Sequence, residues 1–371
     1  MRALAVVLLL FVFLLGVNGL GEGFKSLGRG LLDSFFAATE NPFMGLMVGL
    51  LATTLVQSSS VTTSLIVGLV AAPENPLPIA NAVPMIMGAN IGTTVTNTIV
   101  AMGHMGRKEE FRRAFSVATC HDFFNYIAVV LLLPLEMLTG FLQRGATELS
   151  SLLTGFSGME KYDSPIKGLL KAALEPIRDG IGAVFRSDRL AAIALIVLSV
   201  MLIFTALMLL VRLLRELMHS RVEIIVSRGL HRSPLYAMLV GILVTALVQS
   251  SSITTSLLVP LAGAGLLTLH QAFPITIGAN IGTTITALMA ALAVSGEHAQ
   301  AGIVIALVHL LFNVSATLII FPIKAIRNVP LRAATWLARV AIRSRVWALL
   351  YVAVLFYLLP ALFAVVNHYL G

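Results

Sequence analysis

The chain has 371 residues, of which 58% are hydrophobic and only 11% are charged, and its mean hydropathy is +0.95. Soluble domains carry about 25% charged residues, so this composition excludes an ordinary soluble globular protein and indicates a membrane protein. The net charge of +8 does not indicate nucleic-acid binding, because the basic residues lie in short connections between apolar runs. The single cysteine, Cys120, cannot form a disulfide within the chain.

Apolar runs recur along the whole chain, and a helix needs about 20 such residues to cross a bilayer. The first run follows Met1 and Arg2, as in a signal peptide, but residues 17–20 form a poor cleavage site, so we expect a retained transmembrane helix. The predicted spans lie near residues 3–20, 80–103, 114–138, 190–211, 270–295, 299–323 and 346–368.

The charged segments predict how these spans are connected. The connections 104–113, 212–234 and 324–345 are rich in Lys and Arg, which is typical of cytoplasmic loops. The segment 141–188 mixes both signs of charge, as an external loop does. Residues 21–41, like residues 324–345, have the composition of an amphipathic helix that lies in the membrane interface.

Two further apolar stretches, near residues 43–72 and 235–262, are interrupted in the middle by polar residues. When the spans are threaded through the predicted cytoplasmic loops, each of these stretches must enter and leave the membrane on the same face. We therefore predict two re-entrant helical hairpins, one from each side. Backbone that turns at membrane depth is tolerated only where protein or water covers it.

The chain contains an internal repeat. Residues 55–65 return at 247–257 with ten of eleven positions identical, and residues 88–96 return at 278–286 with eight of nine identical. A weaker similarity places His309, Phe312, Asn313 and Pro322 at the positions that correspond to His121, Phe124, Asn125 and Pro134. The matched spans are predicted to run in opposite directions, so the repeats are inverted.

Inverted repeats with broken helices are typical of secondary transporters, whose site lies at the midplane between the halves. The predicted fold is an all-α polytopic membrane protein with two inverted-topology repeats, each with a re-entrant hairpin and a broken transmembrane helix. Its parts are a first repeat with an N-terminal transmembrane helix (1–140), an extramembrane connecting loop (141–189), a second repeat (190–323), and an interfacial helix followed by a C-terminal transmembrane helix (324–371).

The repeated polar blocks suit an anion and a small cation. A hairpin tip leaves backbone N–H groups at the start of one half-helix, and these groups favour an anion to which serine hydroxyls donate further hydrogen bonds. Carbonyl groups at the end of the other half-helix, with Gln, Asn and Thr oxygens, suit sodium. Gly88 and Gly92, with Gly278 and Gly282, are expected to let a helix open beside the ligand.

The alternative is that Ser and Thr only bond to their own helix backbone or join helices together. This alternative stays open for Thr62, Thr63, Thr254 and Thr255.

Asp122 is an acidic residue inside a predicted span, where a carboxylate is costly unless it faces a cavity or a partner. It is predicted to bind a cation, with proton transfer or pairing with Arg113 as alternatives. Its repeat counterpart is Leu310, so this charge is present in only one copy. His121 and His309 are expected to be helix–helix contacts.

The paired Gln-Ser-Ser-Ser blocks, each followed by Gly-Ala-Asn-Ile-Gly-Thr-Thr, resemble the type II sodium-dependent phosphate cotransporters and their bacterial relatives over about residues 40 to 325. The resemblance implies symport of inorganic phosphate with sodium and no cofactor other than the coupling ions. It assigns the substrate site to Ser58, Ser59, Ser60, Ser250, Ser251 and Ser252. It assigns sodium binding to Gln57, Gln249, Asn90, Thr93, Thr94, Asn280, Thr283, Thr284, Asp122 and Asn125.

The 141–188 segment contains no cysteine, unlike animal members of that family, which indicates a bacterial-type protein. We expect a multi-pass protein of the bacterial inner membrane with a cytoplasmic N-terminus. The alternatives are a phosphate exporter, a carrier of another small oxyanion and a channel-like protein. An intramembrane serine hydrolase is not favoured, because no nucleophile motif surrounds the serines.

Overall fold

A computed structural model describes residues 2–27, 39–72, 76–157, 165–185, 187–206, 233–294 and 298–370, with the single positions 209 and 213, and no strand occurs among them. The first half contains α1 (Arg2–Leu27), α3 (Pro42–Val56), α4 (Ser59–Val70), α5 (Ile79–Thr93), α6 (Val95–Met102), α7 (Lys108–Thr139), α8 (Phe141–Ser157) and α9 (Pro165–Val184). The second half contains the helix Asp188–Ala206, α11 (Pro234–Val248), α12 (Ser251–Gly263), α13 (Leu269–Ala293), α14 (Ala299–Ile320), α15 (Lys324–Ala341), α16 (Arg345–Val352), the π-helix η2 (Ala353–Leu358) and α17 (Leu359–Leu370).

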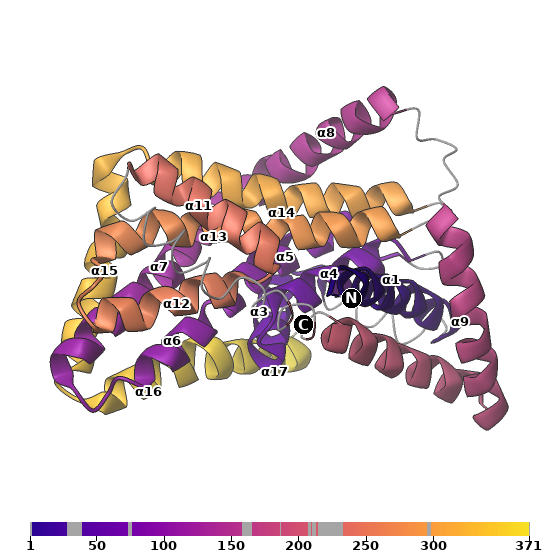
Figure 1. Cartoon of the computed structure of the whole chain (residues 1–371), viewed down its shortest axis with the longest axis horizontal. Helices are drawn as coiled ribbons and strands as arrows, with labels where there is room; N and C mark the ends of the chain where they lie inside the picture. Colours follow the sequence, from indigo (N-terminus) through magenta and orange to yellow (C-terminus); the bar gives the residue numbers. More distant parts are fainter. Residues whose placement is uncertain are drawn as a thin grey trace.

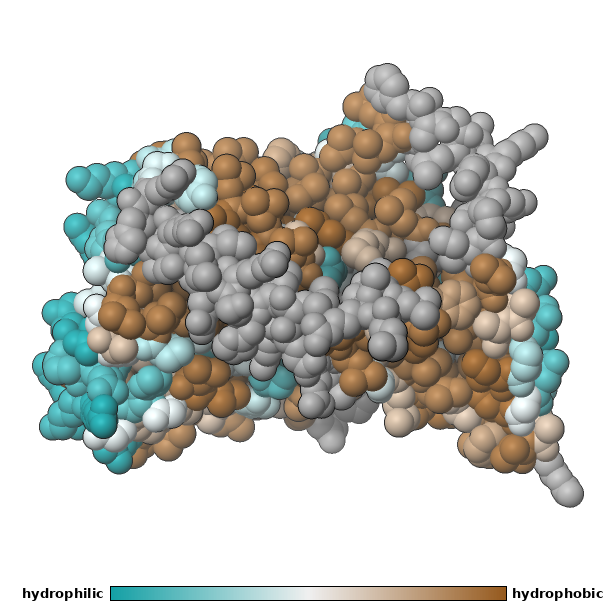
Figure 2. Space-filling view, viewed as in Figure 1, coloured by the Kyte–Doolittle hydropathy of each residue, from teal (hydrophilic) through white to brown (hydrophobic). Residues whose placement is uncertain are grey.

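Five helices of the described chain are long and apolar enough to cross a membrane. They agree with five of the predicted spans and confirm an all-helical polytopic membrane protein. Figure 2 shows apolar residues over much of the viewed face, with hydrophilic residues gathered at the end where α15 and the α6–α7 connection lie and, at the opposite end, along α9. The five helices are Lys108–Thr139, Asp188–Ala206, Leu269–Leu292, Ala299–Ile320 and Arg345–Asn367.

Several segments differ from the prediction. The span expected at 80–103 is broken at Thr94 into α5 and α6, whereas the matching α13 is continuous, so the broken helix predicted for the second copy, with an opening at Gly278 and Gly282, is absent there. The segment predicted as a connecting loop (141–189) is largely helical, because α8 and α9 are amphipathic. Figure 1 shows α8 extending away from the helix bundle.

Two predicted interfacial segments have different outcomes. The structure confirms an amphipathic helix at α15, which buries Leu331, Ala334 and Ala338 on one side. In the other segment, α1 continues to Leu27, and residues 28–38 lie outside the described residues. Most of the predicted loop 212–234 also lies outside them.

Glycines allow the closest helix packing in both copies. A side-chain carbon at Gly88 on α5 would overlap the carbonyl oxygen of Leu46 on α3. The matching Gly278 on α13 has the same relation to the carbonyl of Met238 on α11. The expected role in opening a helix is therefore wrong for Gly88 and Gly278, which lie within helices and let two backbones touch. Each hairpin's first helix is fixed against its neighbour in this way.

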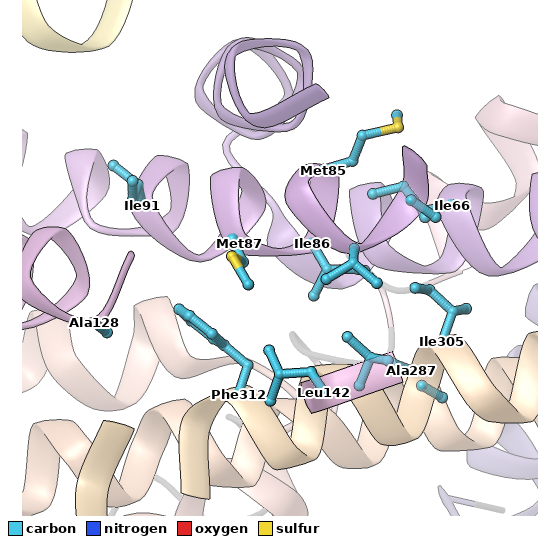
Figure 3. Packing of buried hydrophobic residues seen from close by; sticks show 14 of the residues in the cluster. Ile66, Met85, Ile86, Met87, Ile91, Ala128, Leu142, Ala287, Ile305 and Phe312 are labelled. Atoms are coloured by element: carbon cyan, nitrogen blue, oxygen red, sulfur yellow. The ribbon is translucent and has the colours of Figure 1, made fainter. Parts of the chain in front are cut away.

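The hydrophobic core joins the two halves. Figure 3 shows Ile86 and Met87 of α5 facing Phe312 of α14 and Leu142 of α8, all fully buried. Cys120 on α7 is also fully buried, and its Sγ donates to the carbonyl of Val117 at 3.1 Å. Because this core is continuous across both copies, it holds the two polar hairpin tips in a fixed relation.

Candidate functional site

The two interrupted stretches have the same backbone at their tips. In the first, α3 ends at Val56, Gln57 has a left-handed conformation (φ 58°) and α4 begins at Ser59. In the second, Gln249 has φ 56° between α11 and α12. Within the described chain, these two glutamines alone combine a side chain with positive φ. That conformation costs a non-glycine residue about 1–2 kcal/mol. Its presence in both copies indicates that the glutamine side chain is needed at this position.

The serine that follows each glutamine caps the next helix. The Ser58 hydroxyl accepts from the backbone N–H of Val61 at 3.4 Å, and Ser250 accepts from Ile253 at the same distance. Capping satisfies one of the N–H groups that a helix start leaves free. The remaining first-turn N–H groups of α4 and α12 belong to the other serines of each block. Each tip therefore presents hydroxyl and N–H donors together.

The glutamines connect each tip to the second repeated block. The Thr96 hydroxyl donates to Gln57 Oε1 at 3.0 Å, and the Thr286 hydroxyl donates to Gln249 Oε1 at 2.7 Å. Each glutamine also donates its amide to a carbonyl at the end of its own helix, at 2.7 Å for Gln57 and 2.5 Å for Gln249. The pairs Thr96–Gln57 and Thr286–Gln249 were not among the predicted site contacts.

The two tips touch each other. The Ser60 hydroxyl donates to the backbone carbonyl of Gln249 at 3.4 Å, a contact between the two copies. Ser59, Ser60 and Ser251 are buried, with exposed fractions of 6%, 7% and 3%. Ser58, Ser250 and Ser252 are partly exposed. The two tips that carry the predicted serines are thus in contact.

A buried asparagine network crosses between the copies. The Asn280 amide donates to Asn125 Oδ1 at 2.8 Å, and the Asn313 amide donates to Asn90 Oδ1 at 3.3 Å. These two bonds correspond, because Asn280 is the repeat counterpart of Asn90 and Asn313 that of Asn125. Asn125 also donates to the Asn90 backbone carbonyl at 2.8 Å. Three predicted sodium ligands, Asn90, Asn125 and Asn280, therefore lie in one network.

The network contains residues that were predicted in other roles or missed. His121 lies 2.6 Å from Asn280 Oδ1 through Nε2 and 3.3 Å from the Asn97 amide through Nδ1. Asn97 Oδ1 accepts from the hydroxyls of Thr255 and Ser256 at 2.9 and 3.1 Å. Asn97 was missed because its repeat counterpart is Ala287 and the repeat comparison does not mark it. A polar side chain in an apolar run was the available signal.

The four predicted threonine ligands bond to their own helices. Their hydroxyls donate to backbone carbonyls three or four residues earlier, as expected for threonine in a helix. A hydroxyl that donates in this way keeps its oxygen lone pairs for a cation. The distances are 2.9 Å for Thr93, 2.8 Å for Thr94, 3.2 Å for Thr283 and 2.7 Å for Thr284.

Asp122 is fully buried on α7. Its Oδ2 accepts from the hydroxyls of Thr98 at 3.3 Å and Tyr351 at 2.7 Å, while Oδ1 has no hydrogen-bond partner among the described residues. The alternative of a pair with Arg113 is not realised, because Arg113 donates instead to the carbonyls of Ala262 and Gly263 at the end of α12. The buried carboxyl group thus keeps one oxygen available.

Known proteins identify the family. A family model described as Na+/Pi-cotransporter matches residues 12–161 and 201–357. The chain belongs to the Na+/Pi-cotransporter family. This confirms the resemblance drawn from the repeated Gln-Ser-Ser-Ser blocks, and the matched ranges include both hairpin tips.

Curated relatives of the Na+/Pi-cotransporter chain include sodium-dependent phosphate transport protein 2A of Rattus norvegicus, which is 34% identical over 95% of this chain and 66% of the relative. The 2A protein of Oryctolagus cuniculus is 35% identical over 96% of this chain and 66% of the relative. The 2B protein of Homo sapiens is 31% identical over 95% of this chain and 63% of the relative. The chain therefore spans slightly less than two thirds of these relatives. No solved structure matches it significantly.

Proposed function

We propose that this chain is a sodium-coupled symporter that imports inorganic phosphate by alternating access. The observation that carries the proposal is the contact between two equivalent hairpin tips, made by the Ser60 hydroxyl and the Gln249 carbonyl. It is supported by membership of the Na+/Pi-cotransporter family and by relatives named sodium-dependent phosphate transport proteins.

Phosphate binds at the serines of both tips. The first turns of α4 and α12 offer backbone N–H groups and the positive end of each helix dipole, which favour an anion. Hydroxyl groups donate to the tetrahedral oxygens without a fixed positive charge, so the anion is held and released again. The proposed phosphate ligands are Ser58, Ser59, Ser60, Ser250, Ser251 and Ser252.

Sodium binds at neutral oxygens near the ends of α3 and α11 and at the buried carboxyl group of α7. Side-chain amide, hydroxyl and carboxylate oxygens are the hard ligands that such a cation prefers. The asparagine network supports this role, because it gathers neutral amide side chains from both copies in a buried place, where the amide oxygens of Asn125 and Asn90 accept from Asn280 and Asn313 of the other copy. The proposed set is Gln57, Gln249, Asn90, Thr93, Thr94, Asn280, Thr283, Thr284, Asp122 and Asn125.

The proposed membrane arrangement has two inverted repeats, 1–140 and 190–323, with re-entrant hairpins from opposite sides. The lengths of α3 and α4, 15 and 12 residues, support it, since each is too short to span a bilayer of about 30 Å. Residues 141–189 lie outside the membrane, and residues 324–371 supply an interfacial and a transmembrane helix. The protein lies in the bacterial inner membrane with a cytoplasmic N-terminus.

Import by a carrier is preferred to the other candidates. The residue types of a serine hydrolase are present, but His121 contacts Asn97 and Asn280 instead of a serine. Phosphate export and transport of another small oxyanion would use the same donors, and the uptake experiment below distinguishes them from phosphate import.

Radiolabelled phosphate uptake into proteoliposomes tests the proposal. An inward sodium gradient is expected to drive accumulation, and potassium in place of sodium is expected to abolish it. Competition by unlabelled sulfate would favour a carrier of another small oxyanion. Sodium-independent uptake would contradict symport, and no uptake with either gradient direction would contradict phosphate as the substrate.

A further inference from the structure

The C-terminal helix reaches the buried carboxyl group of α7. Tyr351 lies near the end of α16, outside both repeats, and its hydroxyl donates to Asp122 Oδ2 at 2.7 Å. Thr98 of α6 donates to the same oxygen at 3.3 Å. Two donors on one oxygen fix the plane of the carboxyl group. The other oxygen, Oδ1, is buried and has no hydrogen-bond partner among the described residues.

The Tyr351 ring is held by aromatic neighbours. It packs against Phe115 at a centroid distance of 6.3 Å and Phe123 at 6.4 Å, both on α7, and against Phe356 at 6.1 Å. Phe356 is fully buried within the π-helix Ala353–Leu358. A π-helical turn inserted in an α-helix is uncommon and frequently marks a functional position. The Tyr351 phenol therefore lies in a well-packed part of the helix, directly before the π-helical turn.

The C-terminal helix packs on the first copy. In Figure 1, α16 and α17 run along the edge of the molecule near α6 and α3. This helix contacts α3, α6 and α7, and Asn367 accepts a hydrogen bond from Asn41 at 3.3 Å. Since the counterpart of Asp122 is Leu310, the helix joins the copy that carries the charge.

We infer that Tyr351 is a positioning residue for sodium binding, which orients Asp122 so that Oδ1 is free to bind the cation. The inference rests on the proposed sodium coupling, and it makes the C-terminal helix part of the sodium site at Asp122. Groups that hydrogen-bond to a metal ligand orient it, and their loss typically weakens metal affinity 10- to 100-fold. The free carboxylate oxygen is a hard ligand, which suits the sodium ion of the proposed coupling.

Tyr351→Phe tests the inference, because it removes one oxygen and keeps the ring packing. The sodium concentration for half-maximal phosphate uptake is expected to rise about tenfold, while the phosphate KM at saturating sodium stays unchanged. Tyr357→Phe removes a hydroxyl from the same C-terminal helix and should leave both values as in the wild type. A wild-type sodium dependence in Tyr351→Phe would overturn the inference.

Two further variants separate positioning from folding. Thr98→Val removes the other donor to the same oxygen and is expected to shift the sodium dependence in the same direction. In the Asp122→Asn background, Tyr351→Phe should add no further change, because both act through one group. An additive effect in the double variant would show that Tyr351 acts elsewhere and would overturn the inference.

A binding assay separates this inference from the proposed function. The melting temperature of the purified protein is measured with increasing sodium at constant ionic strength, with potassium as replacement. If the wild type is stabilised by sodium but transports no phosphate, the function fails and the shifted sodium dependence of Tyr351→Phe still supports the inference. If sodium does not stabilise the wild type, the inference fails with the sodium coupling.

Discussion

The tip between α3 and α4 and the tip between α11 and α12 have the same serine cap, the same left-handed glutamine and the same threonine contact, but they lie in different surroundings. Gln57 is exposed, whereas Gln249 is only 9% exposed. Asp122 and Asn97 of the first copy correspond to Leu310 and Ala287 in the second. The duplicated residues therefore give both tips the same local structure, while the residues present in one copy only make their surroundings different.

The ends of the hairpins differ as well. The last carbonyls of α12 accept from the Arg113 guanidinium, at 2.6 Å for Gly263. A cation at a helix C-terminus also interacts favourably with the helix dipole. The residue in the second copy that corresponds to Arg113 is Ala301. The second hairpin is thus anchored to the first copy by a charged group that has no equivalent in the opposite direction.

The largest expected effect tests whether both copies depend on the same close packing. Gly88→Leu and Gly278→Leu should each cost about 3 kcal/mol of stability, because the new side chain overlaps a backbone carbonyl. Thermal melting monitored by size-exclusion chromatography measures this. Gly182→Ala is the control, since nothing lies within 4 Å of its added carbon. Tolerance of leucine in one copy only would break the equivalence of the two helix pairs.

The serines test the shared chemistry. Ser59→Ala and Ser251→Ala should each raise the phosphate KM about tenfold, because each removes a hydrogen bond to an anion worth about 1.5 kcal/mol. Uptake kinetics at saturating sodium measure this, and Ser26→Ala on α1 is the control. Equal shifts in the phosphate KM of the two variants would show that both tips contribute equally to phosphate binding. A shift confined to one copy would mean that phosphate binds to one tip alone.

Substitutions of Gln57 and Gln249 separate the effect of the left-handed backbone from the effect of the side-chain amide. Gln57→Ala should be about 1 kcal/mol less stable than Gln57→Gly, because alanine resists the left-handed conformation and glycine does not. The same difference is expected at Gln249. Both glycine variants should still raise the sodium concentration needed for uptake, since they lose the amide oxygen. Chemical-denaturant or thermal melts with uptake assays provide the two readouts, and sodium dependence unchanged in Gln57→Gly would remove that residue from the cation site.

The smallest expected effect concerns the anchor present in one copy. Arg113→Lys should lower stability by about 1 kcal/mol, because lysine cannot reproduce the forked contact with two carbonyls. Arg112→Lys is the matched control: Arg112 forms an exposed pair with Glu109 at 2.8 Å, and such pairs contribute little. If the two variants have the same melting curve, the Arg113 contact with α12 does not contribute to stability.

Much of this arrangement was open to prediction from the repeat itself. Two near-identical blocks located both tips, and the apolar runs located the long helices, because these features depend on local sequence. The amphipathic pattern that makes α8 and α9 helices was also available, although residues 141–189 were predicted as a loop. The family assignment followed from the same blocks.

Contacts between distant helices were not predictable in the same way. The bonds Ser60–Gln249 and Asn90–Asn313 depend on how the two copies pack, which no local pattern encodes. Tyr351 lies outside the repeats, so the comparison of the copies does not mark it. Gly88 was assigned to an opening helix, because one sequence cannot distinguish a glycine that permits close packing from one that permits unusual backbone geometry.

The burial of Cys120 has a practical consequence for following transport. A thiol with no exposed surface reacts slowly with water-soluble maleimides, so the natural sequence already serves as a low-background host for a single introduced cysteine. A cysteine at the polar, partly exposed position Ser58 of the first tip and one at its counterpart Ser250 form a matched pair. Comparing their labelling rates from each side of a sealed vesicle would report which tip faces which compartment, without any prior change to the chain.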